Sequence, residues 1–233
     1  MKRLLYAATA LGAIALAPVA NAGLVLEYST DGGTTFAPIC SVASGTSCGV
    51  FSMTLSDGLQ LTVTGTQSNS PGTPALADLF SAAVSVTNPT GAQQSVQFRA
   101  GDQGFMAPPV PATLTSNIGG SVAIAGGGNL LTYFSCVDST NGSDACPGTT
   151  NTAPVSPAIT GLGNYSAGDS VTVTALSIPF AMTEEITLTL DAGSAMNFSA
   201  SSTLSPVAEP TSLALLGVGL LGLGFITSRK RPV

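Results

Sequence analysis

The chain has 233 residues, with 6 Lys and Arg against 12 Asp and Glu, a formal net charge of −6, and neither His nor Trp. Because an acidic chain repels the phosphate backbone, this composition argues strongly against nucleic acid as a partner. The lack of His excludes Ser-His-Asp and Cys-His catalysis and leaves zinc without imidazole ligands.

The first 22 residues have the pattern of a secretory signal peptide. Lys2 and Arg3 precede an apolar run, and Ala20 and Ala22 give the segment the A-x-A end of a cleavage site. The run breaks at Pro18 and is shorter than the ~20 residues of a spanning helix, which argues against an anchor. We therefore predict that signal peptidase cleaves after Ala22.

The body of the chain has a different charge balance from its two ends. Between residues 23 and 209 one basic residue, Arg99, stands against all 12 acidic residues, a formal net charge of −11. Low charge density with abundant Val, Leu, Ile and Phe argues against disorder. The length suffices for one domain with a core, so we predict a single secreted globular domain over residues 23–206.

The exported part opens with STDGGTTF, residues 29–36. This stretch resembles the Asp-box of sialidases, which usually ends in Trp where this chain has Phe36. The resemblance implies a propeller, but there is one copy, and the chain is too short for six blades of ~40–50 residues. Sialidases also use an arginine cluster for the substrate carboxylate, and the body offers only Arg99. We therefore interpret Asp31, Gly32 and Gly33 as a tight hairpin turn, not as an active site.

Four cysteines, at positions 40, 48, 136 and 146, lie in the exported part. An even number in an exported chain indicates disulfides, and three pairings are formally possible. Local pairing of Cys40 with Cys48 and of Cys136 with Cys146 closes two short loops, and we predict these two bonds. Zinc is the alternative, but neither a C-x-x-C spacing nor a His supports it.

Period-two alternation of apolar and hydroxyl residues recurs along the body, as in LQLTVTG (59–65), SVTVTAL (170–176) and EITLTLDAG (185–193). Such alternation between turn residues predicts strands. We expect further strands at residues 24–29, 50–55, 79–87, 96–100, 130–137 and 196–204. PALADLF (74–80) could form one helical turn at most. The prediction is an all-β fold, a single antiparallel β-sandwich of jelly-roll or immunoglobulin-like topology.

The loop after residue 137 contains DSTNGSD, which places Asp138, Asn141 and Asp144 between two cysteines. Oxygen ligands of this kind suit calcium, although the spacing is not that of an EF-hand. The alternative is a solvated turn rich in Asp and Asn, which we favour. We expect no cofactor.

Carbohydrate binding commonly uses exposed aromatic side chains as stacking platforms. The candidates here are Tyr28, Phe36, Tyr133, Phe134 and Tyr165, most of them in strand patterns that favour the core. Ice binding is a further alternative, because three Thr-x-Thr pairs occur, at 62/64, 172/174 and 187/189. A flat repeated array needs a fixed period, which these pairs lack, and Thr is a preferred solvent-facing strand residue.

Catalytic alternatives fail on the available residues. The exported part has no Lys for a Ser-Lys pair. Glu184 and Glu185 are adjacent in a predicted strand, so they point to opposite faces and cannot flank one glycosidic bond. We predict that the protein is not an enzyme.

The tail, residues 207–233, combines an acidic-Pro motif, an apolar stretch and a basic cluster. Residues 211–227 could just cross a bilayer as a helix, and Arg229, Lys230 and Arg231 would stay cytoplasmic. This order resembles the PEP-CTERM sorting signal of exopolysaccharide-producing Gram-negative bacteria. Val207, Glu209 and Pro210 fit the family's Val-Pro-Glu-Pro, with Ala208 in place of the first Pro. A plain C-terminal anchor is the alternative.

The resemblance implies transient anchoring in the inner membrane, cleavage by an exosortase at Glu209 and Pro210, and release to the cell surface or medium. We predict a non-catalytic structural or adhesive component of the extracellular polysaccharide matrix. The alternative is a glycan- or calcium-binding module that uses the loop between Cys136 and Cys146.

Overall fold

A computed structural model describes residues 23–124, 126–142, 146, 150–152, 154–159 and 161–207. The predicted signal peptide, the predicted membrane helix and the sorting residues Ala20, Ala22, Glu209, Pro210 and Arg229–Arg231 lie outside these residues. So does Asp144. Within the described residues, no helix is long and apolar enough to cross a membrane.

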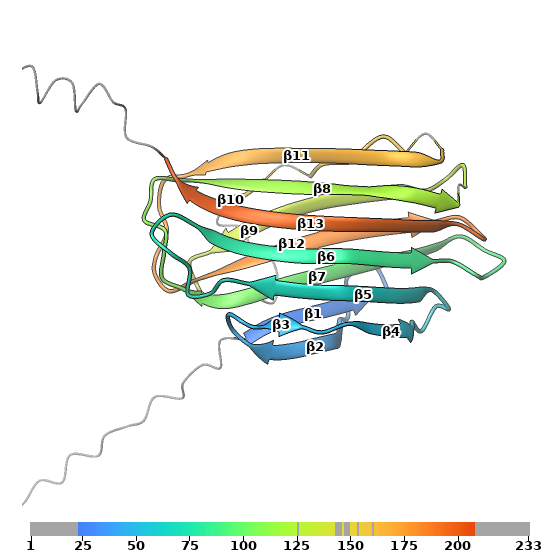
Figure 1. Cartoon of the computed structure of the whole chain (residues 1–233), viewed down its shortest axis with the longest axis horizontal. Helices are drawn as coiled ribbons and strands as arrows, with labels where there is room; N and C mark the ends of the chain where they lie inside the picture. Colours follow the sequence, from blue (N-terminus) through green and yellow to red (C-terminus); the bar gives the residue numbers. More distant parts are fainter. Residues whose placement is uncertain are drawn as a thin grey trace, which may run out of the picture.

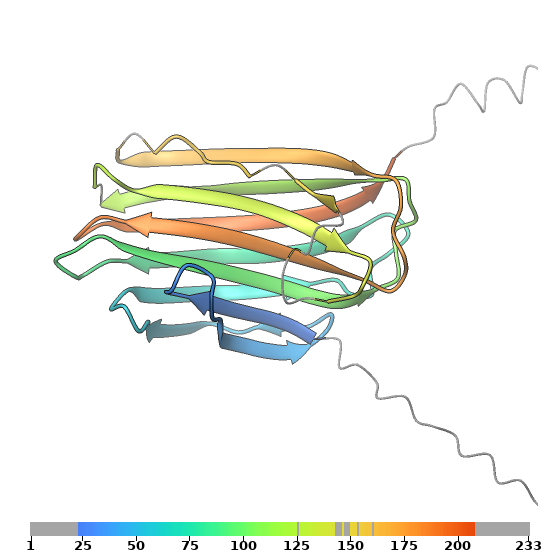
Figure 2. The same cartoon turned by 180° about the vertical axis from the view of Figure 1, so that it is seen from behind.

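The described chain forms two antiparallel sheets packed face to face (Figures 1 and 2). The six-stranded sheet has the order β10-β9-β12-β7-β1-β2. Its strands are β1 (Gly23–Ser29), β2 (Ala37–Ala43), β7 (Gln94–Phe105), β9 (Leu130–Asp138), β10 (Thr150–Asn151) and β12 (Phe180–Leu190). The seven-stranded sheet has the order β11-β8-β13-β6-β5-β3, with β4 also paired to β5. Its strands are β3 (Ser47–Cys48), β4 (Phe51–Thr54), β5 (Gln60–Ser68), β6 (Ala77–Thr87), β8 (Ala112–Ile124), β11 (Gly163–Val173) and β13 (Ala195–Pro206).

The strand pairing identifies the sandwich as a jelly roll. β6 pairs with β13 and β8 with β11 in one sheet, and β7 pairs with β12 and β9 with β10 in the other. This is the pattern of a long double strand wound so that successive pairs alternate between two sheets. β1 and β2 extend one sheet, and β3 to β5 extend the other. The prediction of an antiparallel β-sandwich is confirmed.

The predicted alternation corresponds to the observed burial. In β5 the side chains of Leu61 and Val63 are buried, whereas Thr64 is exposed. In β12 the side chains of Ile186, Leu188 and Leu190 face the other sheet. Apolar side chains from the inner faces of both sheets form one continuous core. Its largest members include Phe98 and Phe198, whose ring centroids lie 6.2 Å apart across the interface.

Two long strands, β2 and β8, were not predicted from the sequence, and neither were the two-residue strands β3 and β10. β8 is 13 residues long and contains Asn117 and two glycines, which have low strand propensity. It forms because it lies between β11 and β13 and is hydrogen-bonded to both. Leu114 and Ile118 point inward and anchor it in the core. PALADLF forms no helical turn, and its last residues begin β6.

Both disulfides have the local pairing predicted from the sequence. Cys40 in β2 is bonded to Cys48 in β3, which ties the edge of the six-stranded sheet to the edge of the seven-stranded sheet. Cys136 in β9 is bonded to Cys146, and the loop between them starts at the end of β9. Disulfides of this kind are typical of proteins that fold in an oxidising compartment.

Candidate functional site

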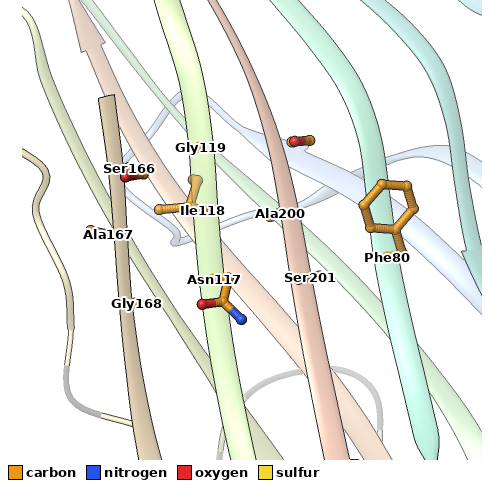
Figure 3. Close-up of a pocket in the computed structure, with 10 residues that line it drawn as sticks. Phe80, Asn117, Ile118, Gly119, Ser166, Ala167, Gly168, Ala200 and Ser201 are labelled. Carbon is orange, nitrogen blue, oxygen red and sulfur yellow. The ribbon is translucent and has the colours of Figure 1, made fainter. Parts of the chain in front are cut away.

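The outer face of the seven-stranded sheet is hollowed where β11, β8, β13 and β6 lie side by side (Figure 3). The depression has a volume of about 440 Å³. Its lining consists of the residues Phe80, Asn117, Ile118, Gly119, Ser166, Ala167, Gly168, Ser199, Ala200 and Ser201. In Figure 3, Asn117 on β8 and Phe80 on β6 lie on either side of β13.

Small residues make this depression. Gly119 on β8 and Gly168 on β11 present no side chain to the surface. Gly168 pairs with Asn117, and an added Cβ there would come within 2.6 Å of Asn117 Oδ1 and 2.8 Å of the Ser116 carbonyl oxygen. β13 also has a bulge relative to β6 between Phe198 and Ala200. Because a bulge increases the local twist, it adds to the curvature of the face.

A second depression, of about 230 Å³, lies on the other side of Phe80. It is lined by Phe80 together with Ser47, Cys48, Gly49, Val50, Thr64, Gly65, Thr66 and Gln67. The bond between Cys40 and Cys48 holds the wall formed by residues 47–50. Phe80 therefore stands between two hollows, and we call the two together with Phe80 the Phe80 groove. Since neighbouring strands lie ~4.8 Å apart, a groove from β11 to β5 extends ~19 Å across the sheet.

The lining of the Phe80 groove carries no formal charge. Ser and Thr hydroxyls and the amides of Asn117 and Gln67 can each donate and accept hydrogen bonds. The ring of Phe80, which is partly exposed, supplies an apolar surface. The groove thus matches a ligand with many hydroxyl groups and apolar C–H faces, and it offers nothing specific to a charged ligand.

The outer face of the six-stranded sheet is built differently, around Arg99. The guanidinium of Arg99 donates from Nη2 to Glu27 Oε2 at 2.8 Å and lies 3.8 Å from the ring centroid of Phe36. Arg99 is also paired across the sheet with Glu185 on β12. Burial raises the pKa of the Glu185 carboxyl, partly offset by Arg99 and by a hydrogen bond from Gln97. Arg99, the one basic residue between residues 23 and 209, is therefore engaged within the fold.

The STDGGTTF segment is the turn between β1 and β2, as the sequence predicts. Asp31 Oδ1 accepts hydrogen bonds from Ser29 Oγ at 2.6 Å and from the backbone N–H groups of Thr34 and Thr35 at 3.0 Å. These bonds hold the pKa of the exposed Asp31 carboxyl well below its usual range. Gly32 and Gly33 both have positive φ, at 75° and 85°. Asp31 is occupied by its own turn.

The calcium candidates in the described residues are likewise engaged by protein donors. Asp138 is 1% exposed and accepts from Thr140 N at 2.8 Å and from Gly142 N at 3.3 Å. Asn141 Oδ1 accepts from Gly104 N at 2.8 Å, which ties the loop to β7. The described residues bring no three acidic, His or Cys side chains together in a metal-binding arrangement.

Glu184 and Glu185 point to opposite faces of β12, as predicted. Glu184 is fully buried between the sheets, where Ser81 Oγ donates to Oε2 at 2.9 Å and Tyr133 OH donates to Oε1 at 3.2 Å. Burial raises the pKa of the Glu184 carboxyl to about 7, although hydrogen bonds from Ser81, Ser202 and Tyr133 oppose the shift. The two carboxylates cannot act on one bond, because the sheet separates them.

Most of the candidate aromatic platforms lie in the core or pack against it, as their strand patterns favoured. Tyr133 and Tyr165 are buried, Tyr28 packs against the core, and Phe36 lies under Arg99. Phe134 is partly exposed on the six-stranded sheet. Phe80 was not among the candidate platforms. The signal that could have identified it is the alternation of residues 79–87, which places Phe80 on the outward face of the strand.

The Thr-x-Thr pairs do not form one array. Thr62 and Thr64 lie on β5 and Thr172 on β11, at opposite sides of the seven-stranded sheet. Thr187 and Thr189 lie on β12, in the other sheet. This distribution offers no flat face with regularly spaced Thr for ice.

No family model matches the chain, and no curated protein matches it. Among solved structures, the fold is similar to the carbohydrate-binding module TmCBM61, which was solved in complex with β-1,4-galactotriose. The match has a TM-score of 0.33 and 6% identity, and it covers 63% of this chain and 88% of that one. A likeness of this size assigns no ligand to the chain.

Proposed function

We propose that the protein is a non-catalytic, secreted or surface-displayed component of an extracellular polysaccharide matrix, and that it contacts neutral polysaccharide through the Phe80 groove. The observation that carries this proposal is the uncharged lining of the two hollows beside one partly exposed aromatic ring. A sugar chain lying across the strands could place one ring against Phe80 while its hydroxyls reach amides and hydroxyls on both sides.

The proposal includes the route by which the protein reaches the matrix. Signal peptidase would cleave after Ala22, and the tail would hold the protein in the inner membrane until an exosortase acts at Glu209 and Pro210. The sequence pattern of the two ends supports this route. The two disulfides, which need an oxidising compartment, agree with an exported protein.

The non-catalytic part of the proposal rests on the placement of the acidic groups. Retaining and inverting glycosidases both need two carboxyl groups ~5–10 Å apart in one cleft. The lining of the Phe80 groove contains no Asp or Glu. A polysaccharide held there would be bound without being cleaved.

Phe80→Ala tests the groove, and Phe134→Ala is the matched control on the outer face of the other sheet. Affinity gel electrophoresis through the exopolysaccharide of the native host, and through galactomannan and hydroxyethylcellulose as defined neutral polymers, measures binding. We expect Phe80→Ala to weaken binding about tenfold, since loss of an aromatic contact removes on the order of 1 kcal/mol. Phe134→Ala should bind as the unmodified protein does.

Equal binding by both variants would place the contact elsewhere, and absence of retardation in every gel would refute polysaccharide binding. A binding-dependent release of new reducing ends would refute the non-catalytic assignment. Because Phe80 lies on the outward face, the melting temperature of Phe80→Ala should change little, which separates lost binding from lost folding.

A further inference from the structure

One end of the sandwich contains both ends of the described chain. Gly23 begins β1 and Val207 follows β13, and Figures 1 and 2 show the start of β1 and the end of β13 at the same end of the sandwich. The connections at this end include 106–111, between β7 and β8, 174–179, between β11 and β12, and 69–76, between β5 and β6. We call this the tail-proximal end, and we call the opposite end, which contains the turns at 30–36, 55–59 and 191–194, the turn end.

The tail-proximal end exposes apolar side chains that the core does not use. Met106 is 53% exposed, Ile178 58% and Val207 43%. Phe105 pairs with Phe180 and their rings stack at 5.4 Å, so the neighbouring Met106 and Ile178 project beyond the buried pair. Val207 N donates to the Pro111 carbonyl oxygen at 2.9 Å, which fixes the exit of the chain beside the 106–111 connection.

Two carboxylates at this end, those of Asp102 and Asp138, are withdrawn from the surface, whereas Glu209, which follows Val207, lies outside the described residues. Asp102 and Asp138 are 0% and 1% exposed. Asp102 accepts from Ser44 Oγ at 2.6 Å and from Gln103 N at 2.7 Å. Asp78 is half-buried and belongs to the outward face of β6, and Asp144 lies outside the described residues. At the turn end, by contrast, Asp31 is exposed and Asp57 and Asp191 are partly exposed.

The length of the following chain limits how far this end can lie from a membrane. Residues 208–212 are the only ones between Val207 and the apolar stretch that begins at Leu213. Five residues and their flanking bonds span at most ~20 Å when fully extended. An inserted tail would therefore keep Val207, and the 106–111 connection to which it is hydrogen-bonded, within ~20 Å of the hydrocarbon.

We propose that the tail-proximal end is a membrane-facing surface that rests on an anionic phospholipid bilayer while the tail is inserted. The inference rests on the membrane attachment within the proposed function. Met106 and Ile178 would enter the interfacial region, where burial of apolar area is favourable. Withdrawal of Asp102 and Asp138 reduces repulsion by anionic headgroups, which an acidic protein would otherwise meet. The Phe80 groove runs along the side of the sandwich and stays accessible.

The chain has no Trp, so one introduced Trp reports its own surroundings. Met106→Trp and the matched control Leu130→Trp, at a residue that is 66% exposed near the turn end, are made in the chain from residue 23 to 233. Each is reconstituted into vesicles of phosphatidylethanolamine and phosphatidylglycerol, with or without lipids brominated near the headgroup end of their acyl chains. We expect bromine to quench the fluorescence of the Met106→Trp variant at least twofold and to leave that of the Leu130→Trp variant unchanged.

Ile178→Trp is a second probe of the same surface, and it should also be quenched; a melting temperature for each variant confirms folding. Protein that floats with the vesicles but shows equal quenching at positions 106, 178 and 130 would overturn the proposed surface alone. Protein that does not float would overturn it together with membrane attachment. Neither outcome bears on the Phe80 groove, which polysaccharide electrophoresis measures independently.

Discussion

The two outer faces of the sandwich differ in how they use charge. On the six-stranded sheet, Glu27, Arg99 and Glu185 form a row across three adjacent strands, with Phe36 stacked on the guanidinium. On the seven-stranded sheet, the Phe80 groove is lined by hydroxyls, amides, glycines and one aromatic ring. The charged side chains of the six-stranded sheet are engaged with one another, whereas the groove on the seven-stranded sheet is accessible to a ligand.

This difference shows how an acidic chain can present a neutral surface. Arg99 is the one basic residue between residues 23 and 209, and the fold places it between two carboxylates, where it compensates charges that would otherwise repel each other. The described residues that line the Phe80 groove need no such compensation, because none of them is charged. Substitutions on the two faces, and in the core between them, test how backbone packing and charge contribute to this difference.

The largest expected effect concerns two adjacent glycines of β8 that face opposite sides. A Cβ at Gly120 would clash with the Asn197 carbonyl oxygen and lie 2.6 Å from Tyr165 OH, whereas at Gly119 the nearest atom is 3.6 Å away. Gly120→Ala should lower the free energy of unfolding by about 4 kcal/mol, because backbone must move. Gly119→Ala should change it by less than ~1 kcal/mol.

Urea denaturation of both variants measures this difference. If the Gly120→Ala protein were as stable as the Gly119→Ala protein, β8 and β13 could move apart at this point without loss of stability. The floor of the groove would then not be rigid.

The next effect is a pH dependence that arises from Glu184, at the centre of the interface between the faces. Its carboxyl has a pKa of about 7, raised by burial from the ordinary value of 4.5. Below pH 4.5 the Glu184 carboxyl is neutral in both the folded and the unfolded chain, so its burial then destabilises the fold least. As the pH rises towards 7, the unfolded chain ionises first and stability falls, by about 3 kcal/mol in total. Denaturation midpoints between about pH 4 and about pH 8 should show this decline.

Glu184→Gln removes the titration and keeps the shape of the side chain. Over the same window its stability should fall by about 3 kcal/mol less than that of the unmodified protein, which leaves only the decline due to other carboxyls whose pKa is raised by burial, those of Asp78 and Glu185. Among the described groups, Tyr133 and Asp78 also influence this site, but the pKa of Tyr133 is raised well above the window. A decline of undiminished size in Glu184→Gln would assign the pH dependence to the other carboxyls whose pKa is raised by burial, those of Asp78 and Glu185.

The sequence predicted well what depends on neighbouring residues along the chain. Alternation located β5 and β12 and the inward positions of Leu61 and Ile186. The turn at Asp31 followed from its local pattern, because its hydrogen bonds join residues at most four positions apart. The spacing of the cysteines predicted both disulfides for the same reason.

The groove depends instead on which strands become neighbours. It joins Phe80, Asn117 and Ser166 with β13, and no local pattern brings together residues that are so far apart in the chain. Glu184 illustrates the same limit: alternation showed that it faces away from Glu185, but not that Ser81 and Tyr133 contact it in the core. The groove and the contacts of Glu184 therefore depend on the order of the strands in the two sheets, which alternation along the chain does not predict.

The smallest expected effect concerns Arg99, whose side chain is 12% exposed against 22% for Glu27. Arg99→Met keeps an unbranched apolar stem on Phe36 but leaves two partly buried carboxylates unpaired. Its cost should be about 2 kcal/mol, between the values for exposed and for buried ion pairs. Arg99→Lys keeps the charge but loses the planar guanidinium and its stacking on Phe36, and it should cost about 1 kcal/mol.

The pH dependence of the Arg99→Met variant separates charge from packing. Because Arg99 holds down the pKa of Glu185, Arg99→Met should raise that pKa further, so the stability lost in this variant should become smaller towards acidic pH. Chemical denaturation at two pH values distinguishes the charge from the packing. If both variants match the unmodified protein at neutral pH, the row on the six-stranded sheet contributes no stability, and the contrast between the two faces would be one of surface character alone.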